Sequence, residues 1–311
     1  MKKIAARDVY GEKLVELGKE NPNIVVLDAD LSSSTKTSVF QKAFPNRHFN
    51  MGIAENNMML FAAGLAVAGK TVFASSFAMF ATGRPWEIIR NSVAYDNLNV
   101  KIVATHAGIS VGEDGGAHQA NEDMAIMRAI PNFKVFCPAD AIEAGHIIEY
   151  AAKNQGPMYI RLSREAFPAF MNQDNASCVT KGKILLDGND LTIIATGSLS
   201  WVALQVAKLL EKEKISAQVI HIPCIKPIDK EIIIDSAKKT KYLFTCEEHS
   251  VLGGLGSAVA EVVCEYEPVP VIRLGVPDEF GQSGKPQELF KLYGLTAEDI
   301  SKKIIKKQQE R

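Results

Sequence analysis

Residues 100–119 read VKIVATHAGISVGEDGGAHQ and join a short apolar run to a glycine-rich polar loop. The run VKIVAT is typical of a strand that is buried on both faces of a parallel sheet. The loop after it holds His106, Glu113, Asp114 and His118 within thirteen residues. Loops at the carboxyl ends of parallel strands are the usual ligand sites of α/β folds, and glycine lets the backbone approach a ligand closely. The stretch therefore predicts an α/β fold with a functional site in this loop.

The same alternation of strands and helices continues on both sides of this stretch. The predicted strands are 24–28, 71–74, 100–105, 133–136, 158–162, 191–196, 217–222, 242–248 and 269–275, and the predicted helices are 7–20, 55–68, 84–96, 120–129, 140–153, 199–213, 229–238, 257–266 and 296–308. The pattern favours mostly parallel sheets with helices on both faces. Residues 166–190 are rich in turn-forming Pro, Asn, Asp and Gly. We therefore expect two three-layer α/β domains, 1–165 and 191–311, with a linker at 166–190.

The composition argues against several classes of protein. Lys and Arg number 35 against 36 Asp and Glu, so no basic excess favours nucleic-acid binding. Residues 58–81 carry one charge, Lys70, and could span a bilayer, but Gly64 and the Gly69–Lys70 turn favour a buried helix and strand instead. The start MKKIAARDVYGEKL does not resemble a secretory signal, and the five cysteines form no CxxC pair. We expect a cytoplasmic protein that binds neither nucleic acid nor membranes.

Two further segments carry candidate site residues. Glu55, in NMGIAENNM, stands at the edge of the most apolar stretch of the chain. It is either an acid that stabilises a helix N-terminus or a carboxylate buried in an apolar wall, where the protonated form is favoured. Phe77 and Phe80, in SSFAMFATGRPW, share one face of a helix and are either core residues or a platform for a flat heterocycle.

The spacing of the polar residues favours a substrate site over a metal site. His106 and His118 are twelve residues apart, which is not the compact spacing of metal ligands, so no metal site is expected in this chain. Imidazoles and carboxylates hydrogen-bond well to a polyhydroxylated or phosphorylated substrate. In IRLSR, 160–164, the strand alternation turns Arg161 and Arg164 to opposite faces, so that one of them either reaches a phosphate at the strand end or is simply a solvated arginine, which this pattern alone favours.

The second half of the chain contains two less specific patterns. SVLGGLGSAVAE, 250–261, is a glycine-rich turn before a helix whose N-terminus could hold an anion. Cys246, Glu247, Glu248 and His249 are consecutive, but successive side chains of a strand alternate between faces and need not converge. We expect this domain to have a structural role and to form dimer contacts.

Together these motifs resemble the C-terminal half of transketolase, over nearly all 311 residues. The motifs that carry the resemblance are DADLSSS (28–34), GIAENNM (52–58), SSFAMF (75–80), THAGISVGEDGGAHQ (105–119), PAD (138–140) and LSR (162–164). The GEDG-x-x-HQ element is the most specific of them. The resemblance implies a pyrimidine-binding domain for thiamine diphosphate followed by the family's C-terminal domain.

The resemblance also implies a role for each site residue. Glu55 would hydrogen-bond the ring nitrogen of the aminopyrimidine and favour the imino form that activates the cofactor. Phe77 and Phe80 would stack on or border that ring. The remaining cofactor-binding residues would be Asp30, Leu31 and Ile53, and the substrate-binding residues would be Arg7, Ser34, His106, Asp114, His118 and Arg164. Glu55, His106 and His118 would be the catalytic residues, and the sugar phosphate would be held by Arg7, Ser34, His106 and Arg164.

Two departures from the family pattern affect the expected assembly and the expected cofactor pocket. The family's Mg²⁺-diphosphate motif, GDG followed about thirty residues later by Asn, has no match here. Gly83 stands where members often have tyrosine, so that either Phe80 and Trp86 compensate or the cofactor pocket is looser. The chain therefore resembles the smaller subunit of a split transketolase. A partner chain would bring the diphosphate site and the Mg²⁺ ligands, in an α2β2 heterotetramer built on a two-fold dimer, and this chain alone would be inactive.

Three alternatives stay open at this point. A 1-deoxyxylulose-5-phosphate synthase-like subunit and the β subunit of a 2-oxo acid dehydrogenase share the domain pair and the cofactor acid. The β subunits lack GEDG-x-x-HQ, and the synthase is normally one long chain. A non-catalytic subunit that binds sugar phosphate or scaffolds a complex is the third, although such a chain would have no need of Glu55.

Overall fold

The computed structural model describes residues 1–310, and within that range seven strands form the first sheet, in the order β12-β6-β7-β5-β4-β2-β3. Its strands are β2 (Ile24–Asp28), β3 (His48–Asn50), β4 (Thr71–Ser75), β5 (Val100–Ala104), β6 (Lys134–Phe136), β7 (Met158–Arg161) and β12 (Cys224–Lys226). All neighbouring pairs are parallel except β12 with β6. Every residue of β2, β4 and β5 is buried, because helices cover both faces of the sheet.

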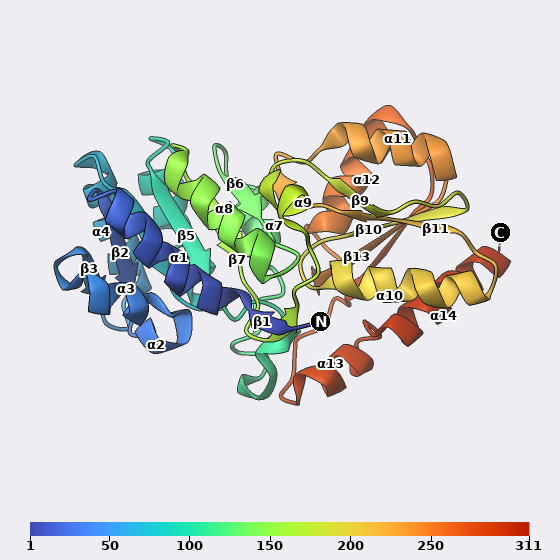
Figure 1. The fold of residues 1–311 in the computed structure, drawn as a ribbon, viewed down its shortest axis with the longest axis horizontal. Coiled ribbons are helices and arrows are strands. Elements are labelled where there is room, and N and C mark those ends of the chain that lie inside the picture. The colour runs from blue at the N-terminus through green and yellow to red at the C-terminus, as the bar shows by residue number, and fades with distance from the viewer. Residues whose placement is uncertain (311) are drawn as a thin grey trace.

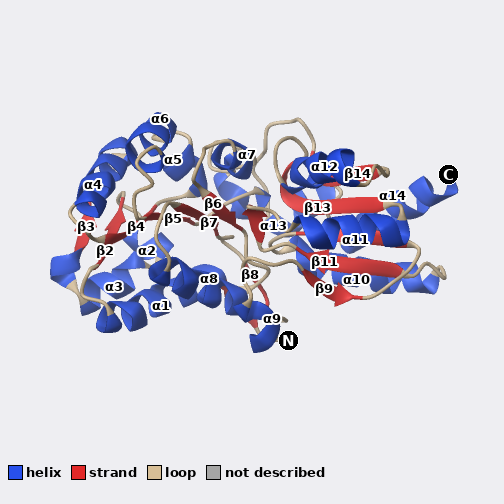
Figure 2. Ribbon diagram, turned by 90° about the horizontal axis from the view of Figure 1, so that it is seen from above, coloured by secondary structure: helices blue, strands red, loops and turns tan. Residues whose placement is uncertain are grey.

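Figure 2 shows the two helical layers of this sheet. One layer contains α1 (Ala6–Glu20), α2 (Ser32–Thr35), α3 (Thr37–Ala43) and α8 (Ala141–Lys153), and the other contains α4 (Glu55–Val67), α5 (Ala78–Thr82), α6 (Trp86–Ile88) and α7 (Asp123–Arg128). Two short 3-10 helical turns, Pro45–Arg47 and Ile109–Asp114, and one π-helical segment, Ile89–Ala94, complete the domain.

The second sheet has the order β14-β13-β10-β11-β9. Its strands are β9 (Lys183–Leu186), β10 (Leu191–Ala195), β11 (Ala217–His221), β13 (Leu243–Ser250) and β14 (Val271–Val276), and only the β9–β11 pair is antiparallel. In Figure 1, α11 (Lys230–Thr240) and α12 (Leu255–Tyr266) lie above it, whereas α10 (Leu199–Lys212), α13 (Pro286–Leu292) and α14 (Ala297–Gln309) lie below it. Two α/β units, each with helices on both faces of its sheet, confirm the predicted fold class.

The two units are joined by more than a connecting segment. The first sheet takes its last strand, β12, from beyond residue 191, in the second half of the chain. The segment predicted as a linker, 166–190, contains β8 (Ala166–Pro168), which pairs with β1 (Lys3–Ala5), then α9 (Gln173–Ser177), and then β9 of the second sheet. It is therefore structured along much of its length, and the domain boundaries themselves stay a prediction.

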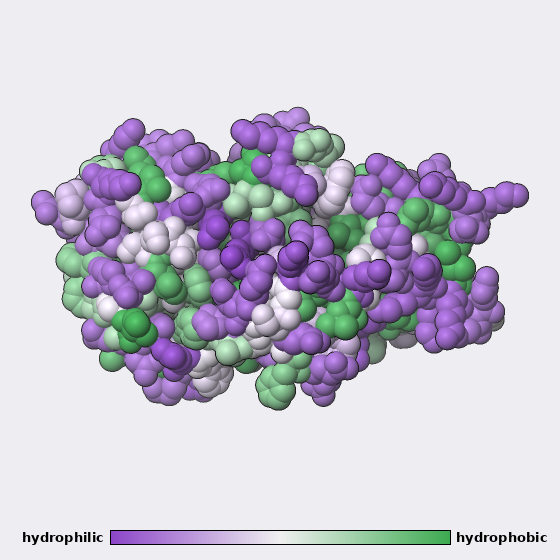
Figure 3. Space-filling model, turned by 90° about the horizontal axis from the view of Figure 1, so that it is seen from below, coloured by the Kyte–Doolittle hydropathy of each residue, from purple (hydrophilic) through white to green (hydrophobic). Residues whose placement is uncertain are grey.

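Seen from the side of α10 and α13, polar side chains dominate, and apolar ones gather in small separate patches (Figure 3). Among the described residues, no helix is long and apolar enough to cross a membrane.

Candidate active site

The predicted site residues gather at one edge of the first sheet, where its parallel strands end. The register places Asp28 of β2 opposite both Asn50 of β3 and Ser75 of β4, and places Ala104 of β5 opposite Arg161 of β7. The loops after these strands therefore begin side by side. This edge is the usual ligand position of open parallel sheets.

Four rings form the centre of the site. The rings of Phe77 and Phe80, which follow β4, are nearly parallel, at 17°, with centroids 6.2 Å apart. His118 meets Phe80 edge to face at 5.3 Å, and His106 stacks on Phe77 at 3.8 Å. Both imidazoles come from residues 105–119, which we name the histidine loop. The structure therefore brings together the two predicted phenylalanines and the two predicted histidines.

His106 is neutral and links two other predicted residues. Arg7 Nη1, at the start of α1, donates to Nε2 of His106 at 3.3 Å and to the carbonyl oxygen of Ser34 at 3.1 Å. The Thr105 hydroxyl lies 2.8 Å from Nδ1 of the same imidazole. Burial, with help from the cations Arg7 and Arg164, lowers the pKa of His106 to about 3. Arg7, Ser34 and His106 therefore form one contiguous polar group beside the rings.

The outer part of the histidine loop is held by a second arginine. Arg164, which follows β7, donates to the carbonyl oxygen of Val111, and its Nη1 lies 3.5 Å from Oε2 of Glu113. Asp114 ends the Ile109–Asp114 turn and is exposed. Arg164 therefore reaches the turn that carries Asp114, at the mouth of the site.

Glu55 is connected to the rings through a residue that the sequence prediction missed. It is the first residue of α4, and its side chain is buried. Arg84 Nη1 donates to Glu55 Oε2 at 3.1 Å, and the guanidinium carbon lies 5.0 Å from the Phe80 centroid. The Arg84 side chain is 55% exposed, so solvent or a ligand can reach this ion pair. The sequence signal for Arg84 is its place four residues after Phe80.

The structure also shows how the chain adapts to Gly83. A Cβ at Gly83 would lie 2.8 Å from the carbonyl oxygen of Met79. Trp86, one of the two residues that could compensate, donates its indole N–H to the carbonyl of Ile126 at 3.2 Å. It is the guanidinium of Arg84 that lies over Phe80 beside this glycine.

Three predicted cofactor residues lie around this edge. Asp30 and Leu31 follow β2, and the backbone N–H of Asp30 donates to Oδ1 of Asn50 at 3.2 Å. Ile53 stands two residues before Glu55 and is 75% exposed. Their assignment to a cofactor pocket stays a prediction.

The N-terminus of α12, where the sequence suggested an anion site, is occupied by a side chain of the same protein. The Glu247 carboxylate accepts hydrogen bonds from the backbone N–H groups of Leu255 at 2.7 Å and Gly256 at 2.8 Å. A carboxyl group of the protein itself therefore satisfies these N–H groups at the start of the helix.

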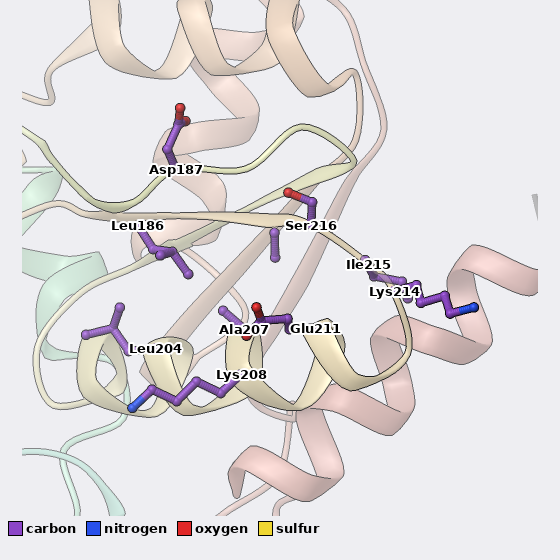
Figure 4. Close-up of a pocket in the computed structure, with 10 residues that line it drawn as sticks. Leu186, Asp187, Leu204, Ala207, Lys208, Glu211, Lys214, Ile215 and Ser216 are labelled. Carbon is purple, nitrogen blue, oxygen red and sulfur yellow. The ribbon is translucent and has the colours of Figure 1, made fainter.

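A separate hollow of about 500 Å³ lies between α10 and the edge of the second sheet (Figure 4). It is lined by Leu186, Asp187, Leu204, Ala207, Lys208, Glu211, Lys214, Ile215, Ser216 and Ala217. Lys208 and Lys214 extend in opposite directions in Figure 4, and the lining is largely apolar. It contains none of the predicted site residues. Within residues 1–310, no group of three or more His, Cys, Asp or Glu is placed to hold a metal ion.

Comparison with known proteins identifies both halves of the chain. Residues 2–169 match the family described as transketolase, pyrimidine binding domain, and residues 180–300 match transketolase, C-terminal domain. A Methanocaldococcus jannaschii protein named as a transketolase C-terminal section is 53% identical over 98% of this chain and 96% of its own length. Human transketolase is 37% identical over 97% of this chain but only 49% of its own.

A solved structure agrees with these sequence relationships. It is a split-gene transketolase in an inactive β4 tetramer, 54% identical, and it superimposes with a TM-score of 0.90 over 97% of this chain and 98% of that one. Both family domains are therefore present in order, and the sequence motifs of the site meet at one sheet edge. The chain belongs to the transketolase family, and it carries that family's pyrimidine-binding and C-terminal domains.

Proposed function

We propose that this chain is the smaller subunit of a two-chain, thiamine-diphosphate-dependent transketolase. The complex would transfer a two-carbon ketol unit from a ketose phosphate to an aldose phosphate, in the cytoplasm and within the pentose phosphate pathway. The observation that carries the proposal is a buried acid, Glu55, that Arg84 links to the nearly parallel rings of Phe77 and Phe80, with the imidazole of His118 against Phe80. A flat heterocycle with a ring nitrogen needs this combination of apolar rings and one proton-sharing group.

The residues present fit one end of thiamine diphosphate. Phe77 and Phe80 offer ring faces, and Glu55 offers a carboxylate oxygen that accepts a hydrogen bond from the half-exposed Arg84. When bound, the cofactor supplies the carbanion chemistry of ketol transfer. Glu55 would hold or share a proton at the ring nitrogen, while Leu31 and Ile53 would exclude water beside it.

The polar residues on the other side of the rings suit a sugar phosphate. Arg7 and Arg164 supply charge and donors for a phosphate, with Ser34 and His106 beside Arg7. Asp114 and His118 would bind substrate hydroxyls, and His118 would also hold a proton near the reacting carbonyl. The buried Nδ1 of His118 has no protein partner among the described residues, so it is free for such a contact.

The surface of α4 supports assembly with other chains. This helix is apolar on nearly every side, yet Leu60, Phe61 and Val67 are exposed, as is Ile53 just before it. A helix that is apolar all round is normally covered. We expect the covering chains to be a second copy of this subunit and a diphosphate-binding partner that supplies the Mg²⁺ ligands, in an α2β2 complex. The β4 assembly of the solved relative supports self-association.

Reconstitution with a diphosphate-domain chain tests the function. Two-carbon transfer from xylulose 5-phosphate to ribose 5-phosphate should require both chains, thiamine diphosphate and Mg²⁺. Pyruvate with glyceraldehyde 3-phosphate should give no product, which separates a transketolase from a deoxyxylulose-phosphate synthase. Robust turnover by this chain alone would overturn the split-subunit assignment.

The variant Glu55→Gln tests the role of the acid. Loss of the proton-sharing group should lower kcat by about 10²–10⁴-fold. The complex should still assemble, as size-exclusion chromatography would show. Unchanged turnover would mean that Glu55 is not the cofactor acid, and inactivity of the wild-type complex with every substrate pair would favour a non-catalytic subunit.

A further inference from the structure

We propose that Glu248, on the second sheet, is a positioning residue through which the C-terminal domain fixes the histidine loop for substrate binding. The inference rests on the proposed function, because it assigns a task to the loop that would hold the sugar phosphate. It also gives the C-terminal domain a role that goes beyond structural support.

The carboxylate of Glu248 spans the junction between the two domains. It lies on β13 and is only 4% exposed. Its Oε1 accepts the backbone N–H of Ser110, in the histidine loop, at 2.7 Å, and its Oε2 accepts the hydroxyl of Ser198, just before α10, at 3.2 Å. One buried side chain therefore connects the loop to the start of a helix in the other domain.

The loop is shaped to receive this carboxylate. Gly108 has a φ of +75°, and a Cβ there would lie 2.4 Å from Glu248 Oε1. Only glycine provides both the left-handed backbone and the space for the oxygen. The glycine two residues after His106 is therefore explained by the approach of Glu248.

Arg161 fixes the backbone around the same contact. Its Nη2 donates to the carbonyl oxygens of Glu248 at 2.9 Å and Ala120 at 3.1 Å, and its Nε donates to Asp123 at 2.8 Å. Burial raises the pKa of the Glu248 carboxyl, whereas Arg161 and the hydrogen bonds from Ser110 and Ser198 oppose that shift. The acid is thus held by donors from both domains.

The outer half of the loop is braced by the segment before α13. Gln119 Nε2 donates to the carbonyl of Gln282 at 3.0 Å, and the Ser283 hydroxyl donates to the carbonyl of Glu113 at 2.6 Å. Figure 1 shows α13 beside the loop that follows β5. These contacts hold the loop at Glu113 and Gln119. Glu248 holds it at Ser110, which is closer along the chain to His106.

The loss of Glu248 should therefore affect substrate binding and leave the cofactor pocket intact. The test uses the reconstituted complex with Glu248→Ala, Glu248→Gln and, as a matched control, Glu247→Ala. Glu247 is the neighbouring buried acid of the same strand, but its two backbone donors belong to α12 and not to the loop. The readouts are KM for each sugar phosphate, kcat, the Kd of thiamine diphosphate, and Tm.

We expect E248A to raise KM for the sugar phosphates about tenfold, because the buried N–H of Ser110 loses its acceptor and the loop becomes looser. The Kd of thiamine diphosphate should stay within about twofold. E248Q should restore most of the loss, since its amide can accept from Ser110 and donate to Ser198. E247A should lower Tm without changing KM. Equal KM values for E248A and E247A, or a Kd that rises with KM, would overturn the proposal.

A readout without catalysis separates this inference from the proposed function. In the isolated chain, hydrogen exchange at Ser110 and through the histidine loop should be at least about tenfold faster in E248A than in E247A, since the amide of Ser110 loses its acceptor. If E248A does not fold, Ser198→Ala removes only the hydroxyl that holds Oε2 and should give the same pattern at smaller size. Faster exchange with an inactive wild-type complex would retain the positioning role but reject the transketolase assignment. Unchanged exchange in both variants would reject the positioning role itself.

Discussion

Arg84 is a residue whose contribution follows from its contacts and not from the family motifs. It is the hydrogen-bond donor to the buried Glu55 and also covers the ring of Phe80. A buried carboxylate that loses its charged donor keeps its desolvation cost without compensation. Under the proposed function the Arg84–Glu55 pair would open when Glu55 turned to the cofactor, so Arg84 would stabilise the chain in the absence of cofactor.

The variant Arg84→Ala should therefore lower the free energy of unfolding of the isolated chain by about 1–3 kcal/mol. Arg84→Lys should lose less, because it retains the charge but not the planar contact with Phe80. Urea denaturation monitored by circular dichroism gives the values. Arg90→Ala, at an exposed arginine on the same surface segment, serves as the control and should change stability by less than about 0.5 kcal/mol. Equal losses in R84A and R90A would contradict the assigned role of the pair.

Sequence patterns predicted which residues gather at the candidate site but not how they pair. His106, His118, Phe77 and Phe80 belong to recognisable local motifs, and the structure brings them together. The pairing of Arg84 with Glu55 joins residues 29 positions apart, and no local pattern specifies which cation meets a given buried acid. Tertiary packing decides such contacts.

At the scale of single elements, α8 shows how one residue fixes both a helix and the segment after the first domain. Asp140 Oδ1 accepts the N–H groups of Ile142 and Glu143, which caps α8, and Oδ2 accepts those of Phe170 and Met171. The segment that begins at residue 166 is therefore attached to the first domain through this carboxylate.

Removal of this carboxylate should destabilise the chain by more than a helix cap alone. Asp140→Ala should lose about 0.5–2 kcal/mol from the cap and a further contribution from the two N–H groups of the attached segment. Asp140→Asn should retain the cap but present an amide to Phe170 and Met171. Guanidinium unfolding, with hydrogen exchange at Met171, separates the two effects. Faster exchange at Met171 in both variants is the expected result, and protection equal to wild type in Asp140→Asn would show that the second oxygen contributes nothing.

The sequence predicted the buried central strands better than the short strands at the sheet edges. Long buried runs such as 24–28, 100–105 and 191–196 were recovered as β2, β5 and β10, because strands covered on both faces have little choice of residue type. Five short strands, β1, β3, β8, β9 and β12, were missed, since pairing with a neighbouring strand creates them, whereas the equally short β6 was predicted at 133–136.

At the scale of the whole molecule, stability should depend on pH through buried groups outside the site. Burial raises the pKa of Glu247 to about 7 from its ordinary 4.5, against the opposing effects of the α12 amides, Arg161 and Arg128. Between these values the folded chain holds a proton that the unfolded chain has released. The stabilisation is therefore fully present below about pH 4.5 and is lost as the pH rises through 7. Burial also lowers the pKa of the neighbouring His249 to about 4 from its ordinary 6.5. Between these values the unfolded chain binds a proton that the folded chain does not, so this group makes the free energy of unfolding rise with pH.

The difference between wild type and Glu247→Gln isolates the contribution of Glu247. As the pH rises from 4.5 to 8, the free energy of unfolding of the wild type should fall relative to that of the variant by about 3 kcal/mol. His249 is present in both proteins, so its contribution largely cancels. Urea titrations at four pH values test this, and parallel profiles for the two proteins would rule out a titration of Glu247 in this range.

The strand β12 has a consequence for how such chains can change in evolution. Its residues pair with β6, and Lys226 Nζ reaches the carbonyl oxygen of Arg128 at 2.7 Å, so the second half of the chain closes the rim of the first sheet. A fragment that ended before it would expose a bare strand edge, which invites aggregation. The two halves are therefore interlocked. A gene that acquired only the first domain would also need β12, or another strand in its place, to cover β6.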